Sequence, residues 1–472
     1  MLTHLIFQYS YQRAFVNLFR RLISATLYFS FFGSIHLSLL ANEPDQSAEV
    51  LEPVPLDQLN SELKVHIEKA AVNSWDMTLQ DILVKRGEAT STRMSSGKGI
   101  KLRLNTNVGF EDEDSGGLDS QGFQFRYRLT ARKPLYHWGA LEADHEYGLL
   151  HVESSKYHRQ IAFLGLYQKL VNSYADYIVL KQRQIEQVSS LELFEADIKL
   201  YRGQVERGEM SNSRFVLEEA KFERSKLVYE SLKNQIVKLE ESFRTVVGIA
   251  EEVPIAYGIH LDSAANDFSA TESQINAFVS QIDKLSLRFQ EKKFRLEQED
   301  LRLQKYTVIN RPKLDGLLRF RRDSETIATG NRNDLELQEA FAGIELNWSL
   351  YDSGAKKGFV LDSIQSKRQL ERELFNLKDS IASDLRYKLA NLKVLVPKSR
   401  LDEQDFGWAV GSYNQALEDR KAGRVSEKDL LILSRNVEIA KTKVFVSRAN
   451  YFKALASLHV AMESASILAY LN

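Results

Sequence analysis

Two neighbouring segments of the chain alternate between apolar and polar residues with a period of two. The apolar positions are Ile100, Leu102, Leu104, Val108 and Phe110, followed by Phe123, Phe125, Tyr127, Leu129 and Ala131. The polar positions between them include Arg103, Arg126 and Arg128. Successive side chains of a β-strand point to opposite faces, so this alternation predicts a strand pair over about residues 99–132. The acidic residues 111–114 and the glycines after them are predicted to form the loop between the two strands.

The second half of the chain repeats this arrangement. Ala340, Ala342, Ile344, Leu346, Trp348 and Leu350 alternate with Phe341, Gly343, Glu345, Asn347 and Ser349. A partner strand is predicted from about Lys313 to Arg321, although Leu317 and Leu318 interrupt its alternation. The second strand pair therefore covers about residues 313–350. The polar stretch from Asp323 to Gln338 is expected to link its two strands.

Strands with two unlike faces admit two interpretations. One is an amphipathic hairpin that packs on a soluble core. The other is a membrane barrel, whose polar face lines a water-filled lumen and carries Arg103, Arg126, Arg128 and Glu345. Four strands are too few to close a barrel, and a bilayer does not tolerate open sheet edges. If the strands are membranous, several copies of the chain must contribute to one barrel.

Long runs of apolar residues elsewhere recur at alternating spacings of three and four. One run is Tyr229, Leu232, Ile236, Leu239, Phe243 and Val246. Another is Leu430, Leu433, Val437, Ala440, Val444, Ser447, Tyr451, Ala454, Leu458 and Ala461. A period of 3.5 residues keeps one seam of a helix facing a partner helix. The pattern therefore predicts antiparallel coiled-coil hairpins.

Two short motifs occur twice at the same separation. The sequence LYHWG at residues 135–139 recurs as LYDSG at 350–354, and GEMS at 208–211 recurs as GRVS at 423–426. In each copy, 69 residues separate the glycines of the two motifs. Since a helix rises about 1.5 Å per residue, this spacing predicts two rods on the order of 100 Å long. We expect the glycine of each turn to end the incoming helix in a left-handed conformation, and Ser211 and Ser426, the latter with Asp429, to cap the outgoing helices.

The remaining segments complete the predicted organisation. Residues 1–41 are predicted to be a signal peptide, because three arginines precede a mostly apolar run; a retained transmembrane helix is the alternative. The other predicted segments are a polar linker (42–55), the first repeat (56–248), a connection (249–270), the second repeat (271–466) and a tail (467–472). The second repeat is expected to open with a helix from Thr271 to Tyr306. Proline usually kinks a helix, and Pro397 lies inside the second rod.

Composition narrows the classes of function. The formal net charge of −1 argues against nucleic acid as a partner. The absence of cysteine excludes disulfides, thiolate metal sites and a cysteine nucleophile. The chain has no phosphate-binding glycine loop, HExxH motif or nucleophile elbow, and His145, His151 and His158 are better explained as a solvated helix face than as a metal site. We therefore expect no enzyme activity, no cofactor and no metal site.

Two copies of strand pair, long helix, glycine turn and returning helix resemble the TolC-like outer membrane efflux and secretion proteins. The resemblance covers about residues 56–466, and its most specific parts are NWSLYDSG at 347–354 and AGRVSEKDL at 422–430. It implies a mostly α fold with a membrane β-barrel portion. It also implies a homotrimer in the cell outer membrane, in which three chains form a barrel of twelve strands that continues as a periplasmic helical tunnel. A periplasmic adaptor (membrane fusion protein) and an inner-membrane pump of the ABC or RND type are the implied partners.

The resemblance also implies functional residues. The adaptor-docking tips would comprise Gly208, Met210, Ser211, Gly423, Val425, Ser426 and Asp429. An acidic gate near the tip would use Glu418 and Asp419, although Asn414 is a rival for the ring position. The expected function is a passive exit duct for small molecules or for secreted proteins, and the sequence leaves the cargo open. The alternative is a non-conducting coiled-coil protein with a structural or adhesive role in the cell envelope.

Overall fold

The long helices of the two repeats have the same length in the computed structural model, which describes residues 61–114, 119–249, 268–327 and 333–471. Helix α4 (Ala140–Glu206) and helix α9 (Ala355–Lys421) each contain 67 residues. Each begins directly after a glycine with positive φ, 81° at Gly139 and 89° at Gly354. Only glycine adopts this conformation without a steric penalty, so it permits the abrupt change from strand to helix. The two equal rods predicted from the repeat are confirmed, and α9 runs through Pro397 as one continuous helix.

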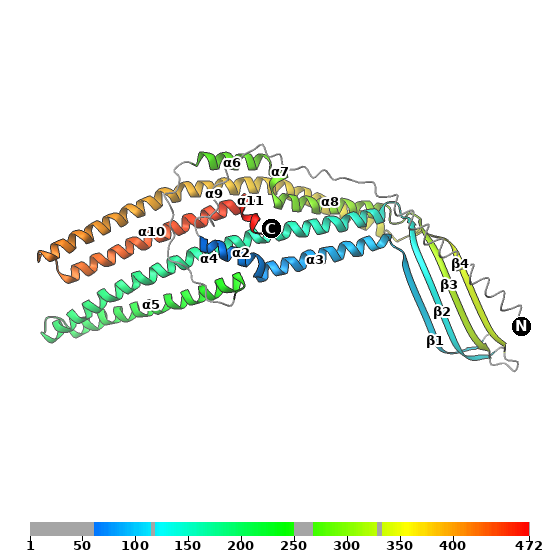
Figure 1. The fold of residues 1–472 in the computed structure, drawn as a ribbon, viewed down its shortest axis with the longest axis horizontal. Helices are drawn as coiled ribbons and strands as arrows, with labels where there is room; N and C mark the ends of the chain where they lie inside the picture. The colour runs from blue at the N-terminus through cyan, green and yellow to red at the C-terminus, as the bar shows by residue number, and fades with distance from the viewer. Residues whose placement is uncertain (1–60, 115–118, 250–267, 328–332, 472) are drawn as a thin grey trace. The chain divides into compact units, whose positions relative to one another are not determined.

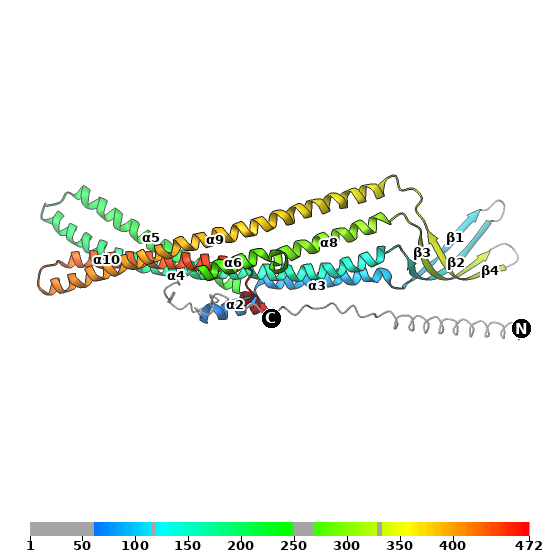
Figure 2. The ribbon, with the colours of Figure 1, turned by 90° about the horizontal axis from the view of Figure 1, so that it is seen from above.

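Shorter helices pack against these rods (Figure 1). Helices α5 (Asn212–Val247) and α10 (Glu427–Ala461) return from the turns, whereas α3 (Trp75–Ser95) and α8 (Leu287–Thr307) lead into the strands. α4 contacts all four of these helices, and α9 contacts α8 and α10. Near the turns the helices therefore lie in the order α5, α4, α10, α9 (Figure 1). Near the strands the order is α3, α4, α8, α9 (Figure 2).

The returning helices end where the strand-proximal helices begin. At the first of these joints, Gly248 (φ 77°) lies so close to the backbone carbonyl of Asn73 that a Cβ atom would stand 2.2 Å from its oxygen. At the second joint, the buried carboxylate of Glu463 accepts hydrogen bonds from Ser286 Oγ (3.3 Å) and from the backbone N–H of Leu287. This carboxylate therefore caps the amino end of α8, where unpaired N–H groups favour an anion.

The sheet contains four antiparallel strands in the order β1-β2-β3-β4. They are β1 (Lys101–Asp114), β2 (Asp119–Tyr136), β3 (Lys313–Ile327) and β4 (Asn333–Asn347). Four strands per chain were predicted, but the assigned loops were too long. Residues 111–114 belong to β1, and much of 323–338 belongs to β3 and β4. Ladder hydrogen bonds use only the backbone, so polar side chains do not stop a strand whose partner runs alongside. The predicted end of β4 at Leu350 was also too late.

The helix predicted from Thr271 to Tyr306 is interrupted. It consists of α6 (Ser269–Ser280), α7 (Ile282–Leu285) and α8, which begins after Ser286. Ser286 has an extended backbone, and its hydroxyl accepts the N–H of Phe289, so it starts a new helix. Apolar burial continues across the break at Phe278 and Ile282, which is why the sequence pattern concealed it.

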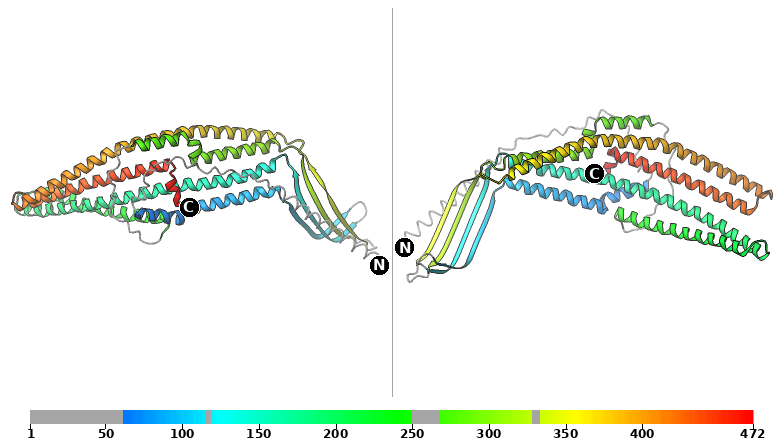
Figure 3. Two further views of the ribbon diagram at one scale, coloured as in Figure 1. Left: turned by 45° about the horizontal axis from the view of Figure 1, so that its top comes forward. Right: turned by 180° about the vertical axis from the view of Figure 1, so that it is seen from behind.

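A hydrophobic core lies where small helices pack on α4 (Figure 3). Helix α2 (Ser61–Asn73) contributes Leu63 and Ile67, and α4 contributes Tyr167 and Tyr174, all almost fully buried. The predicted tail instead includes helix α11 (Ala465–Leu468) and a short 3-10 helix (Ala469–Leu471), which join this core. The predicted signal peptide, the polar linker and most of the 249–270 connection lie outside the described residues.

No single described helix is both long and apolar enough to cross a membrane. One bent pair, α10 with residues 465–471, meets the length and composition requirement at an angle of 86°.

Candidate functional site: the strand face and the helix tips

The strand register places the polar residues of all four strands on the same face of the sheet, as predicted. Three successive rows of directly paired residues are Arg103–Thr130–Arg319–Phe341, Asn105–Arg128–Arg321–Glu339 and Asn107–Arg126–Asp323. Directly paired residues point to the same face. Glu345, which pairs with Asp315, lies on this face nearer to the helices. The structure therefore brings Arg103, Arg126, Arg128 and Glu345 together on one surface.

The opposite face of the sheet is mostly apolar and uncovered by helices, although one of its rows contains Thr106, Arg322 and Gln338. Its exposed large side chains are Leu102, Leu104, Val108, Phe110, Phe123, Phe125, Leu129, Ile344 and Leu346. Phe110 is 86% exposed, which shows that this face is not part of the chain's own core. A contiguous apolar surface of this kind marks a region that contacts lipid or another protein.

A cluster of charges lies where the first strand pair meets the helices. Arg132 pairs with Glu345 and, at 3.8 Å, with the buried Asp315. The other oxygen of Asp315 shares a hydrogen bond of 2.8 Å with Nε2 of His137. These contacts tie β2, β3 and β4 to the segment that precedes α4.

At the equivalent position of the second repeat, a different residue makes different contacts. Asp352, 215 residues after His137, accepts hydrogen bonds from the backbone N–H groups of Gly354 (3.0 Å) and Lys356 (2.9 Å). Asn310 Nδ2 also donates to it at 2.6 Å. The hydrogen bond from Asn310, together with the backbone donors, holds the pKa of Asp352 below its usual value. The carboxylate thus anchors the amino end of α9 in its charged form.

Both tips have the backbone that the sequence predicts. The φ angle is 71° at Gly208 and 74° at Gly423. The next residue donates its N–H across the turn in each case, from Glu209 to Gln204 O (2.8 Å) and from Arg424 to Asp419 O (2.9 Å). This is the Schellman motif, which satisfies carbonyls at the end of a helix.

Both outgoing helices are capped by the predicted serines. Ser211 Oγ accepts the N–H of Arg214 at 3.4 Å, and Ser426 Oγ accepts the N–H of Asp429 at 3.1 Å. Ser426 also donates to Asp429 Oδ2 at 2.6 Å, so the predicted sharing of the cap by this pair is observed. Asp429 thus adds a side-chain hydrogen bond to the cap of the second tip.

The side chains of the tips are mostly exposed. Met210 and Val425, at equivalent positions, are half-buried. At the first tip, Arg207 makes two hydrogen bonds to Glu209, of 2.9 and 3.1 Å, and this pairing lowers the pKa of the fully exposed Glu209. Each tip therefore presents one apolar residue among charged groups.

The gate candidates lie one turn or two before the second tip. Glu418 is exposed and pairs with Lys421 at 2.7 Å, and Asp419 lies 3.5 Å from Arg424. Asn414 is exposed on the same helix. Within one chain, these groups contact only their own hairpin, so the described contacts do not select one of them as a ring residue.

Polar contacts between the two hairpins were not predicted. Gln182 on α4 is fully buried and donates to Glu438 on α10 at 2.8 Å. Nearer the tips, Asp197 pairs with Lys428 at 2.6 Å. Side chains so far apart in sequence carry no periodic signal of their pairing, and only the fold brings them together.

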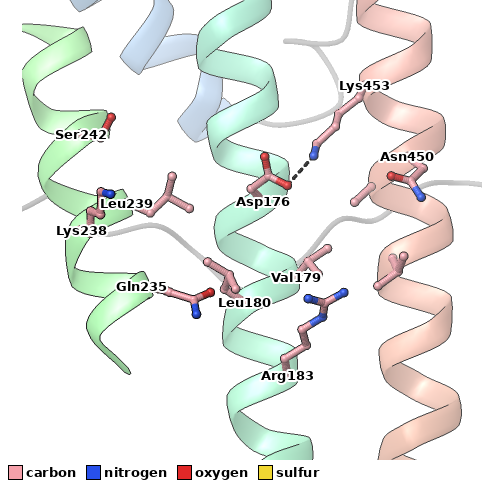
Figure 4. A pocket seen from close by; sticks show the side chains of 12 residues that line it. Asp176, Val179, Leu180, Arg183, Gln235, Lys238, Leu239, Ser242, Asn450 and Lys453 are labelled. Carbon is pink, nitrogen blue, oxygen red and sulfur yellow. Dashed lines mark hydrogen bonds and ion pairs between the residues drawn. The ribbon is translucent and has the colours of Figure 1, made fainter. Parts of the chain in front are cut away.

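A groove of about 450 Å³ lies among α4, α5 and α10 (Figure 4). Its floor includes Val179, Leu180 and Leu239, and an ion pair between Asp176 and Lys453 crosses it. The histidines named above contact neighbouring helices: His145 bonds to Ser95 Oγ (2.8 Å), and His158 to Glu291 (3.1 Å). Within the described ranges, no group of three His, Cys, Asp or Glu residues could hold a metal ion.

Solved structures with this fold are outer membrane proteins. The chain is similar to the CmeC outer membrane channel of Campylobacter jejuni, with a TM-score of 0.68 and 14% identity, over 86% of this chain and 87% of that one. For the outer membrane protein VceC of Vibrio cholerae, the TM-score is 0.64 and the identity 12%, over 86% and 98% of the two chains. For the MtrE outer membrane channel of Neisseria gonorrhoeae, the values are 0.62 and 14%, over 85% and 89%. No protein-family model and no curated protein sequence matches the chain. The TolC-like fold predicted from the repeat is confirmed.

Proposed function

We propose that three copies of this chain, which has the fold of TolC-like outer membrane channels, form an exit duct in the outer membrane. The observation that carries this proposal is the four-stranded sheet with one apolar face, one charged face and two edges, β1 and β4. In lipid, each unpaired backbone group costs several kcal/mol. Pairing β1 of one copy with β4 of the next removes both edges and closes a barrel of three times four strands.

The helices support the same assembly. Helices α5 and α9 lie at the two ends of the helix order near the tips, and each exposes apolar side chains. These are Val216, Leu217, Leu227, Val228 and Val237 on α5, and Phe375, Tyr387, Val394, Leu401 and Trp408 on α9. Apolar surface at both ends of an ordered layer is what a ring of identical copies would cover. The helices would then continue the barrel as a tunnel.

The tips are the proposed docking site for a periplasmic adaptor, which links the duct to an inner-membrane pump of the ABC or RND type. Met210 and Val425 would provide the apolar contacts, and the exposed charges around them the specificity. Glu418, Asp419 or Asn414 would form the gate, while Arg103, Arg126, Arg128 and Glu345 would line the barrel lumen. The pump supplies the energy, and its type decides between small-molecule and protein cargo.

Two measurements test this function. Protein extracted from the outer membrane fraction should have the mass of a trimer in detergent, and it should form ion-conducting channels in planar bilayers. A monodisperse monomer contradicts the assembly. A trimer that never conducts would favour the alternative of a structural or adhesive envelope protein. Genes for an adaptor with an ABC transporter next to this gene would indicate protein secretion, and genes for a proton-driven pump would indicate efflux.

A further inference from the structure

Charge is unevenly distributed along the polar face of the sheet. The three rows given above contain five arginines, which we call the arginine band: Arg103, Arg126, Arg128, Arg319 and Arg321. The same rows contain two carboxylates, Asp323 and Glu339. Five positive groups against two negative ones leave an excess of three positive charges in each chain. Three copies around one lumen would present nine.

Two members of the arginine band, Arg103 and Arg128, are not neutralised as the neighbouring charges are. Nearer the helices, Arg132 is paired with Glu345 and Asp315. Within the band, Arg321 is paired with Asp323. Arg103 and Arg128 are exposed and make no ion pair with any described residue. The charges of Arg103 and Arg128 therefore stay available to solutes.

The strand register places two arginines of the band directly opposite each other. Arg128 and Arg321 lie directly opposite each other on β2 and β3. Like charges at such paired positions destabilise a sheet. The outward positions between the band residues are occupied by Leu104, Tyr127 and Phe320, and Arg322 on β3 is the charged residue of that outward face between the same rows. An anion in the lumen would relieve this repulsion. Anion binding therefore accounts for the paired arginines, whereas packing within the sheet does not.

We propose that the arginine band makes the barrel segment of the duct selective for anions, and that its cargo carries carboxylate, sulfonate or phosphate groups. This inference rests on the proposed trimeric duct. Rings of arginine select anions in pores, and low-dielectric walls focus their field on the water inside. A guanidinium stays charged at every physiological pH and binds these oxyanions with two parallel hydrogen bonds.

The test is the reversal potential of trimers in planar bilayers under a potassium chloride gradient. The native protein passes chloride in preference to potassium, so their permeability ratio exceeds one. Replacing Arg103 and Arg128 by glutamine (R103Q with R128Q) lowers that ratio, by roughly two- to fivefold. The matched control, R103K with R128K, keeps the charges and keeps most of the selectivity. Native channels that conduct with a permeability ratio unchanged in R103Q with R128Q overturn the inference and leave the proposed duct intact.

A second measurement does not depend on whether the tip is open. Purified trimers in detergent are mixed at low salt with a trisulfonated pyrene dye, and binding is followed by fluorescence anisotropy. The native trimer binds this anionic dye more tightly than a cationic dye of similar size, the preference weakens with salt, and R103Q with R128Q reduces it. Equal binding of both dyes by native trimers overturns the inference, whereas failure to obtain any trimer contradicts the duct itself.

Discussion

The returning helices α5 and α10 have the same apolar spacing but very different surroundings. α10 lies between α4 and α9, and eleven of its residues are buried. Among the long helices that the structure describes, α5 packs mainly on α4, and four of its residues are buried. α5 therefore packs against a long helix on one side, whereas α10 packs against a long helix on each of two sides. In the proposed trimer, the exposed side of α5 would be covered by a neighbouring copy.

The two repeats also differ where they must begin or end a helix. His137 reaches across to the sheet, whereas its counterpart Asp352 caps its own helix. Gly248 closes one joint by having no side chain, and its counterpart Glu463 closes the other with a carboxylate. The duplicated architecture constrains helix length and turn geometry. It leaves the chemistry of each contact free to diverge.

The largest expected effect tests the difference in burial between α10, which lies inside the helix layer, and α5, which lies at its edge. Leu458 on α10 is 1% exposed, and its replacement by alanine should lower the free energy of unfolding by about 2–5 kcal/mol, because it leaves a cavity. Leu227 on α5 is 70% exposed, so L227E should leave the helix content intact but lower the fraction of trimer. Circular dichroism in denaturant and the mass in detergent measure the two effects. A trimer unaffected by L227E would contradict a copy-to-copy contact there.

The next effect concerns the turns that both hairpins share. Valine at Gly208 or Gly423 forces a branched residue into the left-handed region, at a cost of about 1–2 kcal/mol, although no atom lies near the new side chain. We expect the double variant to lose export and adaptor binding while it still forms trimers. Gly411→Ala is the matched control, since that glycine is helical with open space around it and alanine should stabilise the helix. If export survives both valine substitutions, the tips are not part of the docking surface.

A smaller effect concerns the junctions at position 137 and its counterpart. Asp352→Ala removes the cap of α9 and should lower the free energy of unfolding modestly at pH 7. The pKa of Asp352 is lower in the folded chain, so its contribution exists above the unfolded pKa and disappears as the pH falls through the folded value. The difference between the variant and the native protein should therefore vanish in acid. A difference that persists at the lowest pH would mean that the charge of Asp352 is not responsible.

The smallest effect concerns the proposed gate. Glu418→Gln with Asp419→Asn should weaken the block of bilayer currents by divalent cations, if three copies bring these groups together. Lys421 and Arg424 partly neutralise the same carboxylates, so a modest change is expected. If block is unchanged in the double variant, both residues belong to an ordinary solvated helix face and not to a gate. Asn414→Asp would then test the rival ring position, because it adds a carboxylate there.

The sequence predicts the parts of the fold that depend on local pattern. The left-handed glycines and the serine caps follow from residues close together in the chain, and helix length follows from the 69-residue separation of the repeated motifs. The breaks at Ser286 and the long extensions of the strands were missed, because they depend on distant partners. Glu463 caps α8 from 176 residues away, and the polar ends of β3 and β4 are held by each other's backbone. The contact of Gln182 with Glu438 was missed for the same reason.

The most direct measurement joins β1 of one copy to β4 of the next. The native chain has no cysteine, so Leu104→Cys on β1 can be combined with Ala340→Cys, Ala342→Cys or Ile344→Cys on β4, all on the apolar face. A disulfide requires Cα atoms roughly 4.4–6.8 Å apart, which neighbouring antiparallel strands provide. One of these combinations should give covalent dimers and trimers, and nothing larger, after oxidation of the intact membrane. A product that never exceeds a monomer in any combination, or a ladder that continues beyond three chains, would contradict the closed trimeric duct.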